Sequence, residues 1–345
     1  MKGWQRSLFR SITSPDQLAE RFGFDPAPIL AVAARYPLRI TPHYLSLIDK
    51  PYDPIWLQAV PDPRELIDEE GIPDPLCEED LSPVRGLIHR YPDRVVWLVS
   101  HTCAVYCRFC MRKRQVGCRG AESVRADREA ALDYIANNGA IRDVILSGGD
   151  PLLLEDDELC ELLGKLRRIP HVEIIRIGTR VPVTLPERIT VSLCRGLKKF
   201  HPLFVNTHFN HPREITPESA AACARLADTG IPLGNQTVLL KGVNDDPSVM
   251  KTLMQTLLRI RVKPYYIHQP DLVRGTRHFR APIDIGIEVM AGLRGHTSGL
   301  ATPYYVIDLP GGKGKVPLLP EDVRREGDRL FVRNYRGEVT EYRET

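Results

Sequence analysis

The sequence predicts an α/β fold centred on a partial (β/α)6, TIM-like barrel. Short apolar runs alternate with helical patterns, the runs are apolar almost throughout, and the strand–helix unit recurs six times. A repeated strand–helix unit indicates parallel strands joined by crossover helices, and uniformly apolar strands are typical of a sheet buried on both faces. No G-x-G-x-x-G follows the first strand, which disfavours a dinucleotide-binding sheet.

The individual elements follow from periodicity along the chain. Strands are predicted at residues 95–100, 143–147, 172–178, 202–208, 232–240 and 262–268. Helices between them are predicted at 127–138, 156–169, 216–230 and 247–260. We expect three parts: an N-terminal helical wrapping segment over 1–88, the barrel over 89–308, and a C-terminal Gly-rich loop plus β-hairpin over 309–345.

Local signals refine the two outer parts. Prolines are frequent in the N-terminal segment, which favours short helices and loops. One such helix is expected to begin at Ser14 or Asp16, since both residue types cap helices. The C-terminal hairpin is expected to turn near Arg336 and Gly337.

Composition excludes several classes of function. The formal net charge is +3, with 43% hydrophobic and 26% charged residues, as in ordinary globular proteins. So small a charge gives no reason to expect a nucleic-acid partner. No run approaches the ~18 apolar residues of a membrane span, and the basic N-terminus is not followed by an apolar signal core. We therefore expect a cytoplasmic protein with no membrane or nucleic-acid partner.

Polar residues gather at or near the C-terminal ends of five of the predicted strands. They lie at 101–110, 147–150, 206–208, 235–236 and 268–271. The C-terminal ends of parallel barrel strands face the same side, where active sites of such barrels are found. The sequence thus predicts a site at this end of the barrel.

Three of the eight cysteines, Cys103, Cys107 and Cys110, form a C-x3-C-x2-C loop after the first barrel strand. Thiolates bind iron–sulfur clusters, and three of them can hold a [4Fe–4S] cluster while leaving one iron open. This spacing is typical of radical S-adenosylmethionine (SAM) enzymes, in which SAM binds the open iron. A zinc site completed by His101, or three cysteines that are simply buried, are the alternatives.

Two glycine-containing segments are further candidates. In Ser147-Gly-Gly-Asp150, glycines permit close approach of the backbone to a ligand, although a tight strand–helix turn would look the same. The segment LPGGKGK at 309–315 can present a lysine to an aldehyde, which is how proteins attach pyridoxal phosphate (PLP). A flexible turn is the alternative for this second segment.

The chain resembles the lysine 2,3-aminomutase family of radical SAM enzymes, from about residue 74 to about residue 320. The resemblance is carried by the three-cysteine loop and by SPVRGLIHRYPDRV (82–95), ILSGGDPLL (145–153), NTHFNHPREIT (206–216), PLGNQTVLLKGVND (232–245) and DLPGGKGKVPLLP (308–320). It implies conversion of L-lysine to β-lysine by 2,3-amino migration, with a [4Fe–4S] cluster, SAM and PLP as cofactors. In the family's route, lysine forms an external aldimine with PLP, and a 5′-deoxyadenosyl radical removes a hydrogen from C3 of that lysine.

The resemblance also implies roles for single residues. Lys315 would hold PLP, with Lys313 the less suitable lysine by register, and Arg90 would bind the PLP phosphate. Arg112 would take the substrate carboxylate as a bidentate partner. Contacts with SAM are implied for Ser147, Gly148, Gly149, Asp150, His208 and Gln236. A barrel histidine without a ligand is the alternative for His208.

Two aspartates bear on the substrate. Asp271 and Asp308 match the family's pair that grips the lysine ε-ammonium, and a buried cation does need carboxylate partners. Surface or loop-capping aspartates are the alternative. The pair argues for lysine, with another amino acid, or β-lysine formation for modifying elongation factor P, as the runner-up activities.

Assembly and partners are implied more loosely. Longer members of the family carry a cysteine after the GVND stretch and a zinc-binding C-terminal extension. Here Asp246 follows that stretch and the sequence ends at Thr345, so we expect a short form without structural zinc, a homodimer, served by a flavodoxin- or ferredoxin-type electron donor. Rival readings are a radical SAM enzyme without PLP and a zinc- or RNA-binding module.

Overall fold

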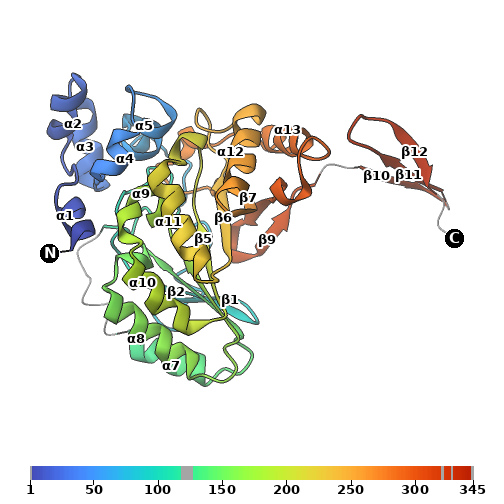
Figure 1. The fold of residues 1–345 in the computed structure, drawn as a ribbon. Coiled ribbons are helices and arrows are strands. Elements are labelled where there is room, and N and C mark those ends of the chain that lie inside the picture. The colour runs from blue at the N-terminus through green and yellow to red at the C-terminus, as the bar shows by residue number, and fades with distance from the viewer. Residues whose placement is uncertain (1, 118–126, 320–321, 328, 343–345) are drawn as a thin grey trace.

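The computed structural model describes residues 2–117, 127–319, 322–327 and 329–342. Its N-terminal part is helical, as expected, and lies against one side of the barrel (Figure 1). The helices are α1 (Gly3–Phe9), α2 (Pro15–Phe22), α3 (Ala27–Arg35), α4 (Pro42–Ser46) and α5 (Pro54–Ala59). The Ser14 hydroxyl accepts a hydrogen bond from the backbone N–H of Gln17, so Ser14 is the cap of α2.

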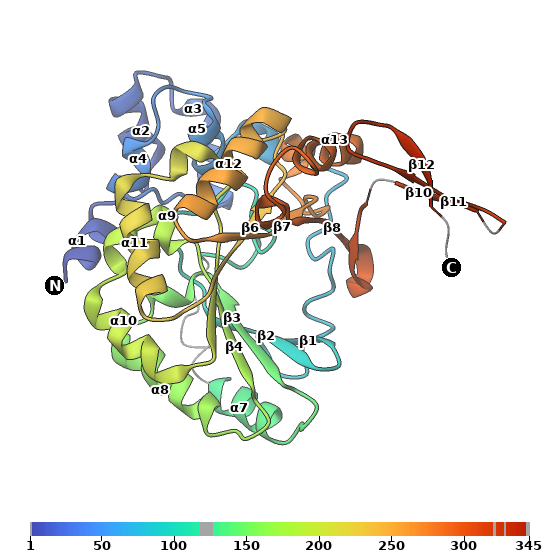
Figure 2. The same cartoon turned by 45° about the vertical axis from the view of Figure 1, so that its right-hand side comes forward.

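A nine-stranded sheet follows, ordered β1 to β9 along the chain. The strands are β1 (Leu87–Tyr91), β2 (Arg94–Ser100), β3 (Asp143–Gly148), β4 (Ile174–Gly178), β5 (Leu203–Thr207), β6 (Leu233–Val238), β7 (Lys263–His268), β8 (Tyr304–Leu309) and β9 (Gly314–Pro317). Strands β2 to β8 are parallel, while β1 and β9 pair antiparallel at the two edges. The sheet curves into a partial barrel (Figure 2).

The predicted α/β partial (β/α)6 barrel is confirmed, and the structure adds one further parallel strand. Six parallel strands were expected, and the structure has a seventh, β8. Only two of the six β8 side chains are buried, so this strand lacks the continuous apolar run that reveals the others.

Six helices connect successive parallel strands and cover the outside of the sheet. They are α7 (Arg128–Ala136), α8 (Asp156–Arg167), α10 (Val191–Leu197), α11 (Pro217–Asp228), α12 (Pro247–Arg259) and α13 (Ile283–Leu293), with a short α9 (Val181–Thr184) before α10. The four helices predicted from periodicity are all present. In α12, for example, Met250, Leu253, Met254 and Leu257 form one buried stripe, the pattern of a helix packed on a sheet.

The C-terminal part differs from expectation in one respect. The segment 309–315, expected as a loop, is largely a tight hairpin in which β8 and β9 pair across a 3-10 turn at Pro310–Gly312. Gly311, Gly312 and Gly314 have positive φ, which explains the glycines. Lys315 therefore lies on a strand and not in a loop. The prediction missed this because a Gly-rich composition is typical of loops and carries no signal for the β8–β9 pairing.

A small antiparallel sheet ends the described chain. Its strands are β10 (Val323–Glu326), β11 (Arg329–Arg333) and β12 (Val339–Tyr342). The hairpin that turns near Arg336 and Gly337 is confirmed, and β10 adds a third strand. This sheet, which we call the C-terminal arm, projects away from the barrel (Figures 1 and 2).

The two boundaries expected between the three parts of the chain both fall within strands of the main sheet. The boundaries after residues 88 and 308 fall inside β1 and β8, so all three parts contribute strands to one sheet. Within the described residues, no helix has the length and apolarity needed to cross a membrane.

Candidate active site

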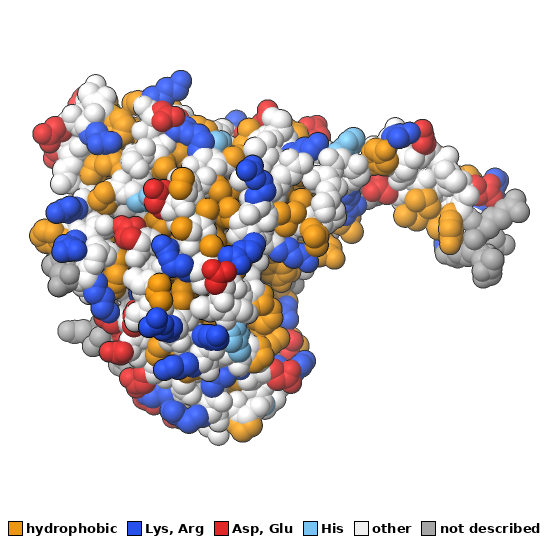
Figure 3. Space-filling model, in the orientation of Figure 1, with side chains coloured by type: hydrophobic (Ala, Val, Ile, Leu, Met, Phe, Trp, Pro, Cys, Tyr) orange, Lys and Arg blue, Asp and Glu red, His pale blue; other side chains and the backbone are white. Residues whose placement is uncertain are grey.

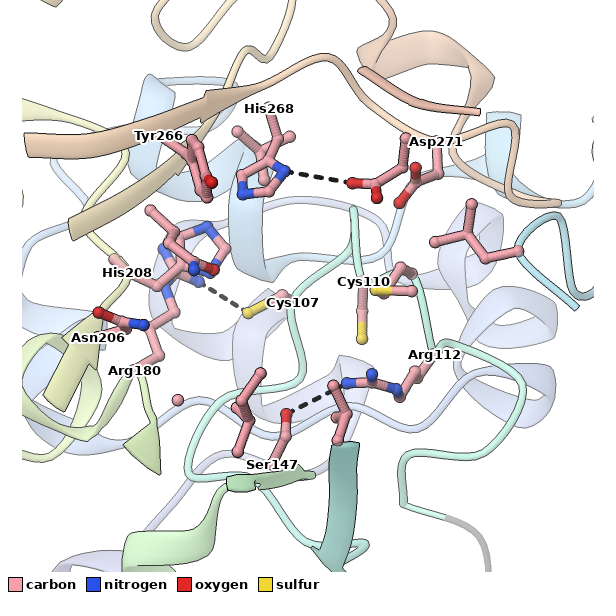
Figure 4. Close-up of a pocket in the computed structure, with 18 of the residues that line it drawn as sticks. Cys107, Cys110, Arg112, Ser147, Arg180, Asn206, His208, Tyr266, His268 and Asp271 are labelled. Carbon is pink, nitrogen blue, oxygen red and sulfur yellow. Dashed lines mark hydrogen bonds and ion pairs between the residues drawn. The ribbon is translucent and has the colours of Figure 1, made fainter. Parts of the chain in front are cut away.

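A cavity of about 830 Å³ runs along the inner face of the parallel strands to their C-terminal ends. Its wall contains every residue that the sequence suggests for the site: Arg90, Cys103, Cys107, Cys110, Arg112, Ser147, Gly148, Gly149, Asp150, His208, Gln236, Asp271, Asp308 and Lys315. The labelled side chains of Figure 4 come from opposite sides of the barrel and face the same space. Residues far apart in the sequence thus share one chamber.

Some members of the strand-end polar clusters do not line the cavity. Among the described residues, neither His101 nor Asn235 is part of the cavity wall. The Asn235 side chain instead accepts from the backbone N–H of Phe209 at 2.8 Å and donates to its carbonyl at 3.0 Å. Asn235 therefore stabilises the turn after β5.

The cysteine loop follows β2 and its three thiols line the cavity. Burial raises the pKa of the Cys110 thiol to about 11 and that of Cys103 well above its usual value. Burial thus favours the neutral form of Cys103 and Cys110, and a nearby positive charge such as iron would favour their ionisation. The Cys107 sulfur accepts a hydrogen bond of 2.8 Å from Nη1 of Arg180 (Figure 4).

Gly148, the last residue of β3, and Gly149, which follows it, are required by close packing. A Cβ on Gly148 would lie 2.2 Å from the Ser100 carbonyl oxygen, and one on Gly149 would lie 2.5 Å from that of Thr102. These neighbours belong to the segment that leads from β2 into the cysteine loop. The glycines thus allow the backbone after β3 to pack directly on the chain that carries the cysteines.

Asp150 is expected as a SAM contact, but its carboxylate has protein partners. It accepts hydrogen bonds from the Thr179 hydroxyl at 2.7 and 2.9 Å, from the Arg180 N–H at 2.7 Å and from the Leu152 N–H at 3.0 Å. Burial raises the pKa of this carboxyl. In the structure Asp150 joins the β3 turn to the segment after β4.

Arg112 is already paired. Its Nε and Nη2 donate to the two oxygens of Glu78 at 2.9 and 2.7 Å, and Nη1 donates to the Ser147 hydroxyl at 3.2 Å. Glu78 binds one side of the guanidinium. The end formed by Nη1 and Nη2 keeps hydrogens that can meet a second carboxylate.

Lys315 lies beside Asp308, its partner in the β8–β9 register. Its Nζ donates to Asp308 Oδ2 and is 3.3 Å from Nδ1 of His268. Arg90 Nη1 contacts the other Asp308 oxygen at 3.3 Å. Burial alone would raise the pKa of Asp308, but hydrogen bonds with His268 and Lys315 and the lysine charge hold it well below its usual range. Burial and Lys315 lower the pKa of His268.

Asp271 behaves in the opposite way. Burial, and next the negative charge of Asp308, raise the pKa of Asp271 to about 7. The two aspartates therefore differ in charge near neutral pH although both line the cavity. A bound cation between them would favour ionisation of both.

His208 and Gln236 are two further polar residues of the wall. His208 donates from Nε2 to Asn210 Oδ1 at 3.0 Å, and burial with the Arg180 charge lowers its pKa to about 3, so the ring is neutral. Its edge contacts the Phe109 ring at 5.5 Å between centroids. Gln236 on β6 lines the cavity as well.

Comparison with known proteins decides the family. Residues 97–253 match the model of the radical SAM superfamily, and residues 290–345 match the model described as lysine-2,3-aminomutase. An L-lysine 2,3-aminomutase of Fusobacterium nucleatum is 53% identical over 89% of this chain and 73% of its own length. The chain belongs to the lysine 2,3-aminomutase family. A protein of Methanococcus maripaludis with the same description is 52% identical over 98% of the chain and 80% of its length.

The family also includes a protein of different description. A glutamate 2,3-aminomutase of Clostridioides difficile is 48% identical over 97% of this chain and 81% of its own length. Sequence identity to lysine 2,3-aminomutases therefore does not by itself identify the amino acid substrate. The residues of the cavity must be considered for that purpose.

Membership of the radical SAM superfamily implies a [4Fe–4S] cluster and SAM. The donor set fits, because three thiols from one loop face the cavity and thiolates are the ligands such clusters need. In the described part of the chain, no three His, Cys, Asp or Glu side chains converge on a single metal ion. The zinc alternative would need His101 as a fourth ligand, and His101 is not among the described residues that line the cavity with the three cysteines.

Several residues that matter to this site were not found from the sequence. Arg180 follows the C-terminal end of β4, and polar residues at that end of a barrel strand are candidates for the site, so the sequence did contain a signal for it. Glu78 lies in a part of the chain without strand pattern, and no local signal marks it. Tyr91 accepts the backbone N–H of Lys315 at 2.9 Å, a pairing across more than two hundred residues that only the fold creates.

Proposed function

We propose that the protein is a radical SAM aminomutase that converts L-lysine to β-lysine with SAM, a [4Fe–4S] cluster and PLP. The observation that carries the proposal is that Lys315, the aspartate pair and the three cysteines line one cavity. A radical generated at the cysteine loop and an amino acid held near Lys315 would therefore share a chamber. The sequence relatives described as L-lysine 2,3-aminomutases support the same activity.

The substrate's two ends suit the charges of the wall. The free end of the Arg112 guanidinium can take the α-carboxylate, with Glu78 and Ser147 holding the side chain in place. Asp271 and Asp308 can take the ε-ammonium. A glutamate side chain would instead bring a third carboxylate to this pair, which is unfavourable in a buried site. The aspartates therefore favour lysine.

Lys315 is the group on which we expect PLP to be held. Two buried nitrogens of the described wall, Arg90 Nε and His268 Nε2, have no hydrogen-bond partner, which suits a bound polar group such as PLP. Lys315 Nζ must lose a proton before it attacks a carbonyl, and Asp308 Oδ2, to which it already donates a hydrogen bond, is the neighbouring acceptor. When bound, PLP would supply a ring able to stabilise an adjacent carbon-centred radical.

The protein's own contribution is mainly positioning. SAM and the cluster would supply the radical that removes a hydrogen from C3 of the substrate. Arg112 at one end and the aspartates at the other fix the substrate, so that C3 and the radical meet in one orientation. The apolar neighbours Phe109, Val238 and Val306 in the wall exclude water from this meeting point.

The role of Lys315 can be tested without turnover. Reduction of the PLP-loaded protein with borohydride should fix a pyridoxyl group to Lys315, visible as a mass increase of one peptide. Lys315→Ala should lose the adduct. Lys313→Ala, two residues away on the same hairpin, is the matched control and should keep it. An adduct that survives in Lys315→Ala would contradict the assignment.

The substrate is tested by anaerobic assay of the reconstituted enzyme. Lysine, glutamate, arginine and ornithine are offered separately and the β-amino acid products are measured. We expect lysine to be the best substrate by kcat/KM. Faster turnover of glutamate than of lysine would reject the aspartate argument.

We further propose a cytoplasmic homodimer that receives electrons from a flavodoxin- or ferredoxin-type donor. The C-terminal arm supports the dimer. The β10–β12 register places Val323, Leu330, Val332 and Tyr342 on one face of the arm, and hydrophobic side chains are visible on its surface in Figure 3. A three-stranded sheet needs cover for such a face, and a second copy of the chain can supply it.

A further inference from the structure

Arg180 is a buried cation that contacts the cysteine loop. It follows β4, is 7% exposed, and its Nη1 donates to the Cys107 sulfur at 2.8 Å. Its guanidinium carbon also lies 5.3 Å from the centroid of the Phe109 ring, inside the same loop. Arg39 donates to the backbone carbonyl of Cys103 at 3.2 Å, but within the described residues no other charged side chain donates a hydrogen bond to the sulfur of Cys103, Cys107 or Cys110.

The rest of the guanidinium is held from several directions. Nη2 donates to Glu214 and to the Gln58 side-chain oxygen, each at 2.6 Å, and to the Tyr44 hydroxyl at 3.0 Å. Nε donates to the His208 carbonyl at 3.2 Å. These partners come from helices α4 and α5, the turn after β5 and the segment beyond it, so Arg180 cannot turn away from Cys107 without breaking several bonds.

The backbone of Arg180 is fixed as well. Its N–H donates to the Asp150 carboxylate at 2.7 Å, and Asp150 belongs to the glycine turn that packs on the chain leading to Cys103. The charge and its support are therefore connected to the cysteine loop at two places. Such an arrangement keeps one N–H aimed at one sulfur.

We propose that Arg180 is a positioning residue that sets the reduction potential of the cluster through Cys107. The inference rests on the proposed function, because it requires that Cys103, Cys107 and Cys110 hold the [4Fe–4S] cluster. Hydrogen bonds to ligand sulfurs and nearby positive charge stabilise the more negative, reduced cluster and so raise its potential. Glu214 balances the charge, but it is placed on Nη2, away from the nitrogen that meets the sulfur.

The electron balance is simple. One electron from a ferredoxin- or flavodoxin-class donor converts the cluster from its 2+ to its 1+ state, with no proton taken up. The same electron then enters the SAM sulfonium, whose S–C5′ bond breaks to give methionine and the 5′-deoxyadenosyl radical. Arg180 acts on the first step, since it makes the cluster easier to reduce.

The test is a redox titration of the reconstituted protein followed by electron paramagnetic resonance. At the wild-type midpoint, Arg180→Gln should hold at least tenfold less reduced relative to oxidised cluster, a shift of about 59 mV to lower potential for one electron. Arg180→Lys keeps the charge but loses the fork, so its potential should fall between these two. Arg176→Gln is the matched control, because Arg176 also lines the cavity on β4 but pairs with Asp143 at 2.7 Å.

The outcomes separate the claims. Equal potentials in wild type, Arg180→Gln and Arg180→Lys would overturn the inference while leaving the proposed function intact, as would an equal shift in Arg176→Gln. If Arg180→Gln assembles no cluster, Arg180→Lys decides, and a wild-type potential there also overturns the inference. A wild-type protein without a [4Fe–4S] signal would instead reject the proposed function itself.

Discussion

At the scale of single residues, the aspartate pair shows how surroundings divide identical side chains. Asp308 is hydrogen-bonded to Lys315 and adjacent to His268, so its pKa is held low. Asp271 lies near the same negative charge in a buried place, and its pKa rises to about 7. Near neutral pH Asp308 is therefore ionised while Asp271 is only about half ionised, and a bound cation would favour ionisation of both.

This division predicts a pH dependence of substrate binding. Asp271 must be ionised to bind an ammonium group, so kcat/KM for lysine should fall about tenfold for each pH unit below ~6. Asp271→Asn should raise KM for lysine about tenfold to a hundredfold and flatten this dependence. Steady-state kinetics between pH 5.5 and 8.5, in steps on the order of half a unit, measure both effects. An unchanged slope in Asp271→Asn would contradict the assignment.

Arg112 and Glu78 illustrate what residue types alone conceal. The resemblance suggests that Arg112 binds a carboxylate, and the structure shows that one carboxylate, Glu78, already does so. Removing this partner leaves a buried charge unpaired, which is costly.

We therefore expect Glu78→Gln to raise KM for lysine more than it changes kcat, because the guanidinium loses its fixed orientation. The measurement is a comparison of both constants with those of Glu79→Gln, whose carboxylate contacts Arg114 and Gln115 instead. Equal effects of the two substitutions would show that Glu78 has no particular role in orienting Arg112.

At the scale of elements, the turn after β3 links fold and site. Gly148 has φ of 127°, and a Cβ there would approach the Ser100 carbonyl to 2.2 Å. Glycine is required at this position by both the backbone angle and the packing. The sequence suggested a ligand as the reason for the glycines, whereas the structure shows the β2 segment beneath the cysteine loop.

Gly148→Ala should therefore destabilise the chain by about 3 kcal/mol. Gly139→Ala is the control, since nothing lies within 4 Å of its Cβ position. Denaturant unfolding of the two metal-free variants measures the difference, and similar free energies of unfolding would show that the turn has room to adapt.

The β8–β9 hairpin is the second element that joins fold to site. Its register sets Lys315 directly opposite Asp308, and opposed residues of an antiparallel pair lie on the same face. A loop would leave the lysine free to move. The strand instead fixes its distance from the aspartate that the substrate also needs.

At the scale of the whole molecule, the C-terminal arm is a small sheet with several exposed hydrophobic side chains. Leu330 and Tyr342 are opposed on one face, while Val339 lies on the other face with Arg333. Tyr342 is 61% and Val339 60% exposed, so the arm has no packed core of its own.

If the first face covers a second copy, Leu330→Asp should convert the dimer to a monomer, because it buries a charge in the contact. Val339→Asp on the opposite face should leave the dimer unchanged. Analytical ultracentrifugation gives the molecular mass of both variants, and a dimeric Leu330→Asp protein would contradict this use of the arm.

Local information in the sequence determined a large part of this protein. Amphipathic helix periodicity and continuous apolar strand runs predicted the barrel. A covering helix must place one apolar face on the sheet, and a strand buried on both faces must be apolar throughout. The cysteine spacing is likewise local, since one loop supplies all three thiols. The roles of Lys315, Asp271 and Asp308 were instead implied by the resemblance to the lysine 2,3-aminomutase family.

Only the tertiary structure decided how these residues support one another. Arg180 meets Cys107, Glu78 meets Arg112 and Tyr91 meets Lys315 across stretches of chain that carry no shared pattern. Such pairs depend on strand order, register and the wrapping of the N-terminal helices, which act between distant segments. The sequence was therefore sufficient to predict the residues expected to carry the chemistry. Their charged and hydrogen-bonded partners depend on the tertiary fold, because these partners come from distant segments.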